Sequence, residues 1–403
     1  MLNEKIKQLS TNYFPKVQAI RRHLHQYPEL SFQEFKTSKY IQQQLSDAKI
    51  EFTTGYVKTG IIALIKGKNP DKRTILLRAD MDALPITEKN NVSYKSCNEG
   101  IMHACGHDVH SACALGAAFI LNDLKEEWEG TVKIMFQPGE EVLPGGAKLM
   151  IEAGILENPK VDKAIALHVF SSMPVGKVGF KSGMYMASTD ELYLTVNGKG
   201  GHAAMPDEYI NPLIIASEIL LEINNTFNSS EGFKILRSDV EILRSKPPTV
   251  IAFGSIEGKG ATNVIPDKVE LKGTFRTMDE IWRSEVHLQL QTIVDKYSKK
   301  YNITSILNIV KGYPFLVNDE NFTTQCIANA QSFLGKENVE ELPLRMTAED
   351  FAFITQKVPS CFFRLGTGNI EKNITSGVHT PTFNIDEKAI EIGMGVLAQL
   401  AVN

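Results

Sequence analysis

The segment Thr74-Ile-Leu-Leu-Arg-Ala-Asp-Met-Asp82 decides the fold class. Its first six residues form a short, mainly apolar run, which is typical of a strand buried within a sheet. Other strands are predicted at 60–65, 131–136 and 164–167, and helices at 4–47, 111–124 and 145–153. Strands that alternate with helices indicate an α/β layer structure. We therefore expect a mostly parallel sheet with helices on both of its faces.

The sequence pattern changes near Met186. From Glu191 to Val196 polar and apolar residues alternate, as in a strand with one exposed face. A helix, two strands and a second helix are then predicted at 212–225, 250–256, 268–275 and 278–297. We expect these elements to form a ferredoxin-like α+β domain at 187–297, inserted into a discontinuous domain of residues 1–186 and 298–403.

The length and composition of the chain fit a globular protein of about two domains. Hydrophobic residues make up 43% of the 403 residues and charged residues 22%, both of which are ordinary values. The formal net charge is −4, which does not predict a surface for nucleic acid or for an anionic membrane. We therefore expect neither nucleic acid nor a membrane as a partner.

The five cysteines are odd in number and scattered, so they do not indicate a disulfide framework. The first residues lack an apolar core of the length that a signal peptide needs. No apolar run is long enough to predict a membrane span. These features predict a cytoplasmic protein with free thiols, one of which can serve as a metal ligand.

Polar residues occupy the carboxyl ends of three predicted strands. Asp80 and Asp82 follow the first strand, Glu140 and Glu141 follow the second, and His168 follows the third. In open α/β sheets, ligands bind outside the carboxyl ends of the strands. We therefore expect these five side chains to converge on one crevice, a conclusion that needs only the topology.

A further feature is the stretch His103-Ala-Cys-Gly-His-Asp-Val-His110, just before a predicted helix. Cys105 and His107 are two residues apart, so both can reach one cation from an extended loop. The start of a helix also favours the thiolate form of a cysteine. Thiolate, imidazole and carboxylate ligands together suit zinc, with manganese or cobalt as alternatives. Calcium and magnesium are not first choices, because they prefer sites built of oxygen.

Each of these residues also has a purely structural interpretation. A single histidine in an α/β protein is more often a hydrogen-bonded structural residue, and Cys105 alone would be a small buried hydrophobe. Asp80 alone could cap a helix, and Glu140 and Glu141 alone could lie on a solvated loop. Their combination in one part of the chain favours a metal site. The structural interpretation is kept for His23, His25, His287, Cys97, Cys113, Cys326 and Cys361.

Seven stretches carry motifs of one known family. They are Arg21-Arg-His-Leu-His-Gln-Tyr-Pro-Glu-Leu30, Leu77-Arg-Ala-Asp-Met-Asp-Ala-Leu-Pro85, Met102-His-Ala-Cys-Gly-His-Asp-Val-His110, Phe136-Gln-Pro-Gly-Glu-Glu141, Gly198-Lys-Gly-Gly-His-Ala-Ala-Met-Pro206, Thr262-Asn-Val-Ile-Pro-Asp267 and Val378-His-Thr-Pro381. Together they resemble the M20 metallopeptidases, specifically the amidohydrolase branch of hippurate hydrolases, auxin-conjugate hydrolases and N-acetyl-diaminopimelate deacetylases. The resemblance covers essentially the whole chain and is highly specific.

The resemblance implies a two-metal amidohydrolase. The positions that match its metal ligands are Cys105, His107, Glu141, His168 and His379. Glu140 matches the general base, and Asp82 matches the aspartate that orients a metal-bound group or supports that base. The implied cofactors are two zinc or manganese ions per subunit, with cobalt or nickel as alternatives.

The resemblance also implies that the smaller domain is a lid through which the chain forms a homodimer. His202 matches a lid histidine that steadies the oxyanion, in relatives often from the partner subunit. Asn263 and Arg276 lie where relatives bind the carboxylate of the substrate. The lid is thus expected to complete the site that the larger domain begins.

The implied substrate is a small N-acyl amino acid with an acetyl, benzoyl or aryl-acyl group, whose amide bond a metal-activated water cleaves. A dipeptidase or aminopeptidase on the same metal core is one alternative, although the Cys105 motif favours the acyl branch. A non-catalytic metal-binding protein on this fold is another, but it would not need Glu140 or Asp82.

Two stretches depart from the family's usual motifs. Thr347-Ala-Glu-Asp-Phe351 replaces the usual Gly-Ser-Glu-Asp-Phe, and His379 is followed by threonine where serine is commoner. Neither change removes an expected ligand. The first is expected to reshape the substrate pocket, so the resemblance does not identify the substrate.

Overall fold

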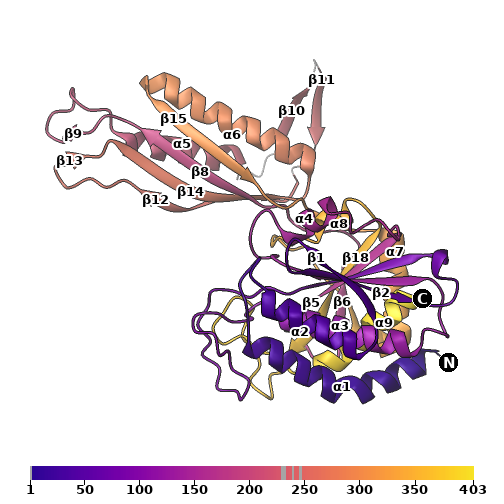
Figure 1. Cartoon of the computed structure of the whole chain (residues 1–403). Helices are drawn as coiled ribbons and strands as arrows, with labels where there is room; N and C mark the ends of the chain where they lie inside the picture. The colour runs from indigo at the N-terminus through magenta and orange to yellow at the C-terminus, as the bar shows by residue number, and fades with distance from the viewer. Residues whose placement is uncertain (1, 228–232, 238–239, 245–246) are drawn as a thin grey trace. The chain divides into compact units, whose positions relative to one another are not determined.

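The computed structural model describes residues 2–227, 233–237, 240–244 and 247–403. The chain forms two compact units (Figure 1). The first unit comprises residues 1–185, 317–344 and 349–403, and the second comprises residues 186–316 and 345–348. The second unit is therefore an insertion in the sequence of the first.

A sheet of eight strands forms the centre of the first unit, in the order β1-β2-β4-β3-β5-β18-β6-β17. The strands are β1 (Glu51–Tyr56), β2 (Gly60–Lys66), β3 (Thr74–Asp80), β4 (Thr131–Gln137), β5 (Lys163–Pro174), β6 (Val178–Phe180), β17 (Val339–Glu341) and β18 (Ser360–Gly368). The neighbours β4, β3, β5 and β18 are parallel, as are β6 and β17, whereas β1–β2, β2–β4 and β6–β18 are antiparallel. The sheet is therefore mixed, and the carboxyl ends of four parallel strands meet at one edge.

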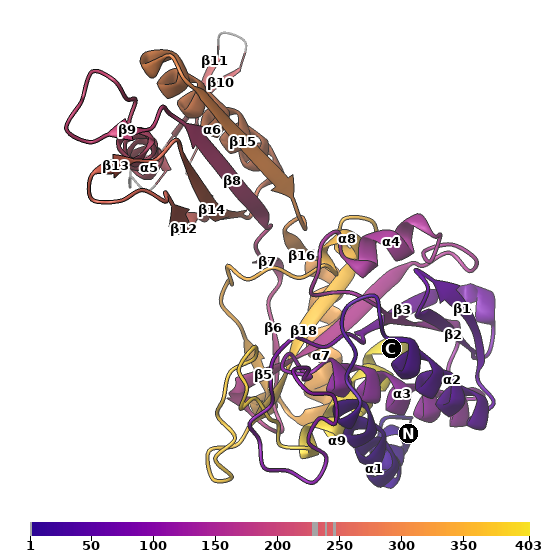
Figure 2. The same ribbon diagram turned by 60° about the vertical axis from the view of Figure 1, so that its left-hand side comes forward.

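Helices cover this sheet. They are α1 (Leu2–Gln26), α2 (Phe35–Asp47), α3 (His107–Asp123), α4 (Gly146–Glu152), α7 (Glu320–Leu334), α8 (Ala352–Thr355) and α9 (Lys388–Val402). α3 contacts α1, α9 and β3, and its residues from His107 to Leu121 are all buried, as expected for a helix of small and apolar residues. Figures 1 and 2 show α1, α3 and α9 gathered together, with α4 and α8 away from this layer. The α/β class predicted from the sequence is confirmed.

The second unit contains an antiparallel sheet in the order β12-β14-β8-β15. Its elements are β8 (Asp190–Asn197), β9 (Gly201–His202), α5 (Pro212–Phe227), β10 (Phe233–Arg237), β11 (Val240–Arg244), β12 (Thr249–Glu257), β13 (Val264–Ile265), β14 (Lys268–Thr277), α6 (Glu280–Tyr301) and β15 (Thr304–Lys311). Leu192, Leu194 and Val196 alternate along β8 with more exposed residues and join Ile219 and Val286 in one core. One face of the sheet is therefore buried against α5 and α6.

The second unit continues beyond residue 297, where the sequence analysis placed its end. β15 pairs along its whole length with β8, so residues 304–311 form the edge strand of this sheet. The prediction missed this because β15 alternates polar and apolar residues, and such a pattern does not show which sheet a strand joins. The main segment of this unit extends to Leu316, and residues 345–348 also belong to it.

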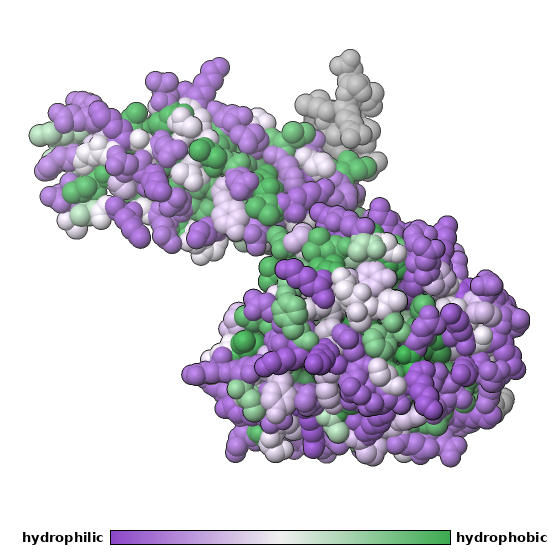
Figure 3. Space-filling view, viewed as in Figure 1, coloured by the Kyte–Doolittle hydropathy of each residue, from purple (hydrophilic) through white to green (hydrophobic). Residues whose placement is uncertain are grey.

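Short elements complete the fold: η1 (Pro70–Lys72), β7 (Gly183–Met186), β16 (Leu316–Asn318) and η2 (Lys336–Asn338). All five cysteines lie in the described part of the chain and are free thiols, as predicted. Among the described helices, none combines the length and the apolar character that a membrane crossing requires. Hydrophilic residues predominate on the surface of each unit on the face that Figure 3 shows.

Candidate metal centre

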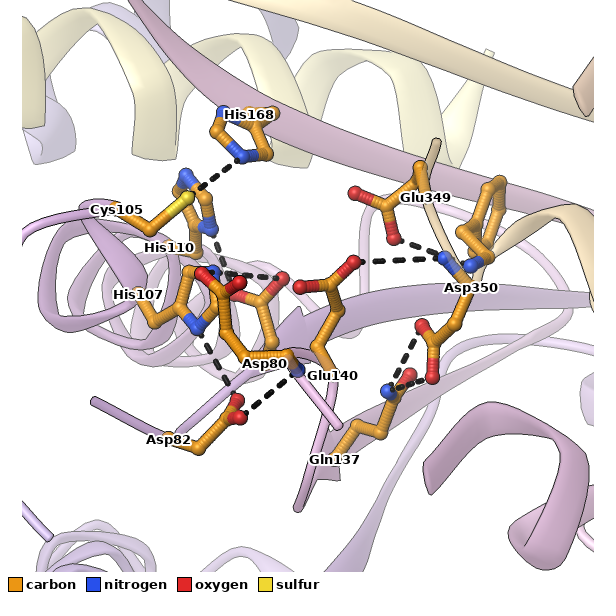
Figure 4. A network of polar contacts seen from close by, with 12 residues as sticks. Asp80, Asp82, Cys105, His107, His110, Gln137, Glu140, His168, Glu349 and Asp350 are labelled. Atoms are coloured by element: carbon orange, nitrogen blue, oxygen red, sulfur yellow. Dashed lines mark hydrogen bonds and ion pairs between the residues drawn. The ribbon is translucent and has the colours of Figure 1, made fainter. Parts of the chain in front are cut away.

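The carboxyl ends of the parallel strands carry most of the candidate side chains. Asp80 is the last residue of β3, and Asp82 follows it by two residues. β4 ends at Gln137, and the loop that leads from it to α4 carries Glu140 and Glu141. Because β3 and β4 are parallel neighbours, these side chains leave the sheet at the same edge (Figure 4).

His168 lies within β5 and not after it, in contrast to the predicted end of that strand. β3 pairs with β5 only as far as Arg78 and Ala166, so β5 continues past the end of its neighbour. The carbonyl of Val169 accepts a hydrogen bond from Nδ1 of His168 at 2.8 Å. This bond holds the ring proton on Nδ1 and leaves the lone pair on Nε2. That Nε2 lies 3.4 Å from Sγ of Cys105.

His107 begins α3, directly after a residue that must be glycine. Gly106 has a φ of +85°, and a Cβ atom there would lie 2.5 Å from a methyl group of Val169, so no larger side chain fits this turn. Nδ1 of His107 donates to Oδ1 of Asp82 at 3.1 Å. Its Nε2 is buried and has no hydrogen-bond partner among the residues that the structure describes. An imidazole oriented by a carboxylate in this way is typical of a metal ligand.

Glu141 and His379 come together from distant parts of the sequence. Oε1 of Glu141 lies 3.3 Å from Nε2 of His379 and 3.8 Å from Nε2 of His107. The backbone amide of His379 donates to the carbonyl of Ala104 at 2.7 Å. This hydrogen bond ties the C-terminal loop to the residue before Cys105, so a late segment of the chain reaches the centre.

These residues fit divalent metal ions. Three overlapping groups each bring ligand atoms within 4.8 Å of one another: Cys105 with His107 and His168, Cys105 with Glu141 and His379, and His107 with Glu140 and Glu141. A bound cation would satisfy the buried, unpartnered Nε2 of His107. Sulfur, nitrogen and oxygen donors in one group suit zinc and similar transition metals.

Glu140 lies beside the candidate ligands and also belongs to a second group, with Glu349 and Asp350. Oε1 of Glu140 accepts a hydrogen bond from the backbone amide of Asp350 at 3.5 Å (Figure 4). Burial and the neighbouring carboxylates of Glu349, Glu141 and Asp350 raise the pKa of Glu140 well above its ordinary value. A carboxyl group with a raised pKa is suited to accept and release a proton near neutral pH.

Arg78 balances the acidic groups beneath Glu140. Its buried guanidinium lies 2.6 Å from Asp80, 2.7 Å from Asp350 and 2.8 Å from Glu349. Charge-assisted hydrogen bonds of this kind compensate for the desolvation of buried ions. The acidic cluster of Glu349 and Asp350 therefore carries its own counter-ion and is a less suitable metal site than the group around Cys105.

His110 belongs to a further group of possible ligand atoms, with Asp80 and His107, but both of its ring nitrogens already have hydrogen-bond partners. Its Nδ1 lies 2.6 Å from Oδ1 of Asp80, and its Nε2 accepts a hydrogen bond from the amide of Val169 at 3.0 Å. Because Nε2 accepts, the proton must lie on Nδ1 and the ring is neutral. Burial lowers the pKa of His110.

The thiol of Cys105 was predicted to have a lowered pKa because a helix follows it, but the structure indicates the opposite. Burial, followed by the negative charges of Glu141 and Glu140, raises the pKa of the Cys105 thiol well above its ordinary value. These two effects depend on the folded structure, and they outweigh the effect of the helix start at His107. Metal binding to this thiol requires the loss of its proton. Burial and the charge of Arg364 lower the pKa of His168, which keeps that imidazole neutral.

The other three predicted site residues lie in the second unit. His202 is exposed on β9 and pairs with Val264 of β13. Asn263 is the residue before Val264. Arg276 is half-buried on β14 and donates to the carbonyl of Met346 at 3.4 Å. The metal centre lies in the first unit, so the roles of His202, Asn263 and Arg276 at that centre stay predictions.

Three histidines that were assigned structural roles make contacts within the fold. His23 stacks on Tyr40, with ring centroids 3.8 Å apart. His25 is fully buried, and its Nδ1 lies 2.8 Å from Asp108. His287 lies 2.7 Å from Asp190 in the second unit.

Sequence reasoning assigned no function to several residues that the structure places around Glu140. They are Arg78, His110, Gln137, Glu349 and Asp350. Of these residues, Arg78 could have been recognised from the sequence, because a cation within an apolar strand requires a buried negative partner. The sequence did not show which of its many carboxylates that partner is.

The similarity of this chain to known proteins extends over both units. Residues 76–403 match the model described as peptidase family M20/M25/M40. N-acetylcysteine deacetylase of Bacillus subtilis is 35% identical, over 95% of this chain and 95% of that protein. IAA-amino acid hydrolase ILR1-like 5 of Arabidopsis thaliana is 34% identical, over 97% of this chain and 87% of that protein. A crystal structure of the Bacillus subtilis YXEP protein, described as a dinuclear metal-binding peptidase from the M20 family, aligns with a TM-score of 0.80 and 32% identity, covering 97% of this chain and 98% of that chain.

Proposed function

Because this chain belongs to peptidase family M20/M25/M40 and is a metallo-hydrolase that acts on amide bonds, we propose that it removes the acyl group from small N-acyl amino acids. The observation that carries this proposal is the position of Glu140. Its buried carboxyl group lies within one group of ligand atoms with His107 and Glu141. A proton acceptor is thus held beside the donors that would bind the metal.

Cys105, His107, Glu141, His168 and His379 would hold two divalent ions, zinc or manganese, with cobalt or nickel as alternatives. Bound there, such ions would supply a water of lowered pKa and would polarise the amide carbonyl. The chain's own residues would perform the remaining steps, which are orientation of the ligands, proton transfer and binding of the substrate.

Glu140 would take the proton of the attacking water and pass it to the nitrogen that leaves. Burial and the neighbouring carboxylates, which raise the pKa of Glu140, favour its uptake of this proton. Adjacent Glu141 faces His107 and His379, whereas Glu140 contacts the amide of Asp350. The two neighbouring glutamates can therefore have different tasks.

Asp82 would orient His107 through the hydrogen bond to Nδ1, so that Nε2 faces the metal centre. The same carboxylate accepts a hydrogen bond from the backbone amide of Glu141 at 3.0 Å. Asp82 would therefore fix two candidate ligands without binding metal itself.

We assign the second unit the role of a lid that also forms a homodimer. His202 would stabilise the oxyanion that develops on the amide carbonyl. Asn263 and Arg276 would bind the carboxylate of the amino acid. This assignment is supported by the family motifs that contain His202 and Asn263.

The acyl class is supported by the names of two relatives, an N-acetylcysteine deacetylase and an IAA-amino acid hydrolase. Acetyl, benzoyl and aryl-acyl amino acids are therefore the first substrates to test. The alternative is a dipeptidase on the same centre, which is supported by the structural neighbour described as a peptidase.

A substrate panel distinguishes the two functions. Metal-stripped protein receives zinc, manganese, cobalt or nickel and is offered N-acetyl, N-benzoyl and indole-acyl amino acids beside free dipeptides. Release of the amino acid is followed by a reagent for free amines, or by chromatography for the dipeptides. We expect hydrolysis of acylated amino acids. Cleavage of dipeptides alone would favour the alternative, and failure to cleave any compound with any metal would contradict both proposals.

A further inference from the structure

The glutamate loop, defined here as residues 138–147, runs from the end of β4 into the first turn of α4. It is held by three buried carboxylates. Glu34 accepts a hydrogen bond from the amide of Gly139 at 2.9 Å. Asp82 accepts one from the amide of Glu141, and Asp350 accepts one from the amide of Ala147 at 2.9 Å. The three acceptors come from separate parts of the sequence. The loop that carries Glu140 is therefore fixed at its start, its middle and its end.

Asp350 makes the most extensive of these contacts. Besides Ala147, its carboxylate accepts hydrogen bonds from Nε2 of Gln137 at 2.9 and 2.7 Å and from Arg78 at 2.7 Å. Gln137 is the last residue of β4, and Ala147 is in the first turn of α4. One carboxylate thus binds both ends of the glutamate loop, and the backbone amide of the same residue contacts Oε1 of Glu140 (Figure 4).

The two ends of the glutamate loop are also packed closely against each other. The amide of Gly146 donates to the carbonyl of Gly139 at 2.8 Å, and a Cβ atom on Gly146 would lie 1.6 Å from the carbonyl oxygen of Pro138. The two ends of the loop are therefore in direct backbone contact. Such close packing transmits a displacement of Ala147 or Gln137 to Glu140, because neighbouring atoms have no free volume to absorb it.

We propose that Asp350 is a positioning residue for Glu140, because its carboxylate joins the two ends of the glutamate loop while its backbone amide contacts the carboxyl group of Glu140. The inference rests on the proposed function, in which Glu140 transfers the proton. It assigns a role to a residue in a stretch, 347–351, for which only an effect on pocket shape was expected from the sequence.

Asp350→Asn tests this relationship with nearly unchanged side-chain volume. The new amide nitrogen must face one of the donors from Ala147, Gln137 or Arg78, so at least one hydrogen bond is lost. We expect kcat to fall by on the order of 100-fold, which is the effect of a small misplacement of reacting groups. KM and metal content should stay at the wild-type values, since the ligands are not touched.

A double variant separates positioning from general damage. In the Glu140→Gln background, Asp350→Asn should cause no further loss of kcat, because the group that it positions is already inactive. If the two losses multiply, Asp350 does not act through Glu140 and the proposal is wrong. Unchanged kcat in the single variant, or a loss of metal, would also overturn it.

Lys133→Met is the control, at a buried charged residue of β4, the strand that ends at Gln137. The buried ammonium of Lys133 donates to the carbonyls of Ile155, Glu157 and Pro159, which lie outside the glutamate loop. Its removal should lower the melting temperature without changing kcat. Equal losses of kcat in Lys133→Met and Asp350→Asn would show that reduced stability alone explains the effect.

Hydrogen exchange gives a readout that does not depend on activity. In Asp350→Asn, the backbone amides of residues 139–143 and 145–147 should exchange faster than in the wild type, whereas those of β3 should not. If the wild type cleaves no compound of the panel, the proposed function fails and this measurement still tests the loop contacts. If Asp350→Asn does not fold, Gln137→Met is measured in its place, because it removes one of the side chains that donate to Asp350. Unchanged hydrogen exchange of the glutamate loop, in whichever of the two variants folds, contradicts the proposal.

Discussion

Nδ1 of His107 lies 3.1 Å from Oδ1 of Asp82, and both side chains are fully shielded from solvent. The other oxygen of this carboxylate accepts hydrogen bonds from the hydroxyl of Ser31 at 2.7 Å and from the amide of Glu141 at 3.0 Å. One carboxylate thus orients the ring of one candidate ligand and the backbone of another. Its loss should affect metal binding before it affects any other property.

Asp82→Asn should weaken metal binding by about 10- to 100-fold, the usual effect of removing a partner of a ligating histidine. Competition with a chelator of known affinity measures this. Ser31→Ala is the control, because it removes one hydrogen bond to Asp82 and leaves the contact with His107; its effect should be smaller. Wild-type affinity in Asp82→Asn would exclude Asp82 as the orienting residue.

Glu140→Gln should retain both metal ions and lose roughly 10²- to 10⁴-fold in kcat, the range for loss of a general base or acid. Glutamine has nearly the same shape as glutamate but cannot take up the proton of water. Metal content by elemental analysis and steady-state kinetics are measured on the same preparation. Turnover at the wild-type rate would show that another group accepts the proton.

Cys105→Ala should reduce the number of bound metal ions, because it removes the only sulfur among the five proposed ligands. Cys113→Ala is a suitable control, since Cys113 is also buried but belongs to none of the groups of candidate ligands. Elemental analysis after dialysis gives the stoichiometry of each variant. Two ions in both variants would remove Cys105 from the ligand set.

His202→Ala should fold and bind metal but turn over slowly, by the role proposed for it at the oxyanion. If His202 acts across a homodimer, mixing inactive His202→Ala with inactive Glu140→Gln should restore part of the activity, because some mixed dimers contain one intact site. Subunit exchange is verified first with tagged chains. Exchange without recovery of activity would indicate a site that is complete within one chain.

Glu34→Gln should change how stability depends on pH. Burial, followed by the charge of Asp82, raises the pKa of Glu34 from 4.5 to about 7. Because the folded state binds this proton more tightly than the unfolded state, the contribution of Glu34 to stability is present below pH 4.5 and is lost as the pH rises through 7. At pH 8 the cost of ionisation approaches about 3 kcal/mol.

Glutamine resembles the protonated form of Glu34 and can still accept the hydrogen bond from Gly139. The variant should therefore be as stable as the wild type at pH 4.5 and more stable at pH 8. Thermal unfolding of metal-stripped proteins across this pH range measures the difference. A constant difference at every pH would show that the pKa of Glu34 is not raised by folding.

Much of the first unit could be predicted because its signals are local. Residues 74–80, 131–137 and 60–66 are buried strands, and apolar runs of this length identify such strands without knowledge of their neighbours. The length of β5 could not be predicted, because its residues beyond His168 are extended by pairing with β18. The same reason explains β15, whose place depends on β8.

The residues that hold the candidate ligands in place were much less predictable from the sequence than the ligands themselves. Cys105 and His107 stand close together in a recognisable motif, but Asp350 meets Arg78 across 272 residues of sequence. Such a pairing depends on the completed fold and leaves no periodic trace in the chain. The same holds for the thiol of Cys105, whose environment is set by Glu141 and Glu140 after folding.

The hydrogen bond between the amide of His379 and the carbonyl of Ala104 has a consequence for biosynthesis. A ribosome makes the chain from its N-terminus, so Cys105, His107, Glu141 and His168 are synthesised long before His379. The proposed set of five ligands cannot be complete until residue 379 has been synthesised. By this proposal, loading with both metal ions follows synthesis of this loop, and a nascent chain that stops short of it would carry an incomplete centre.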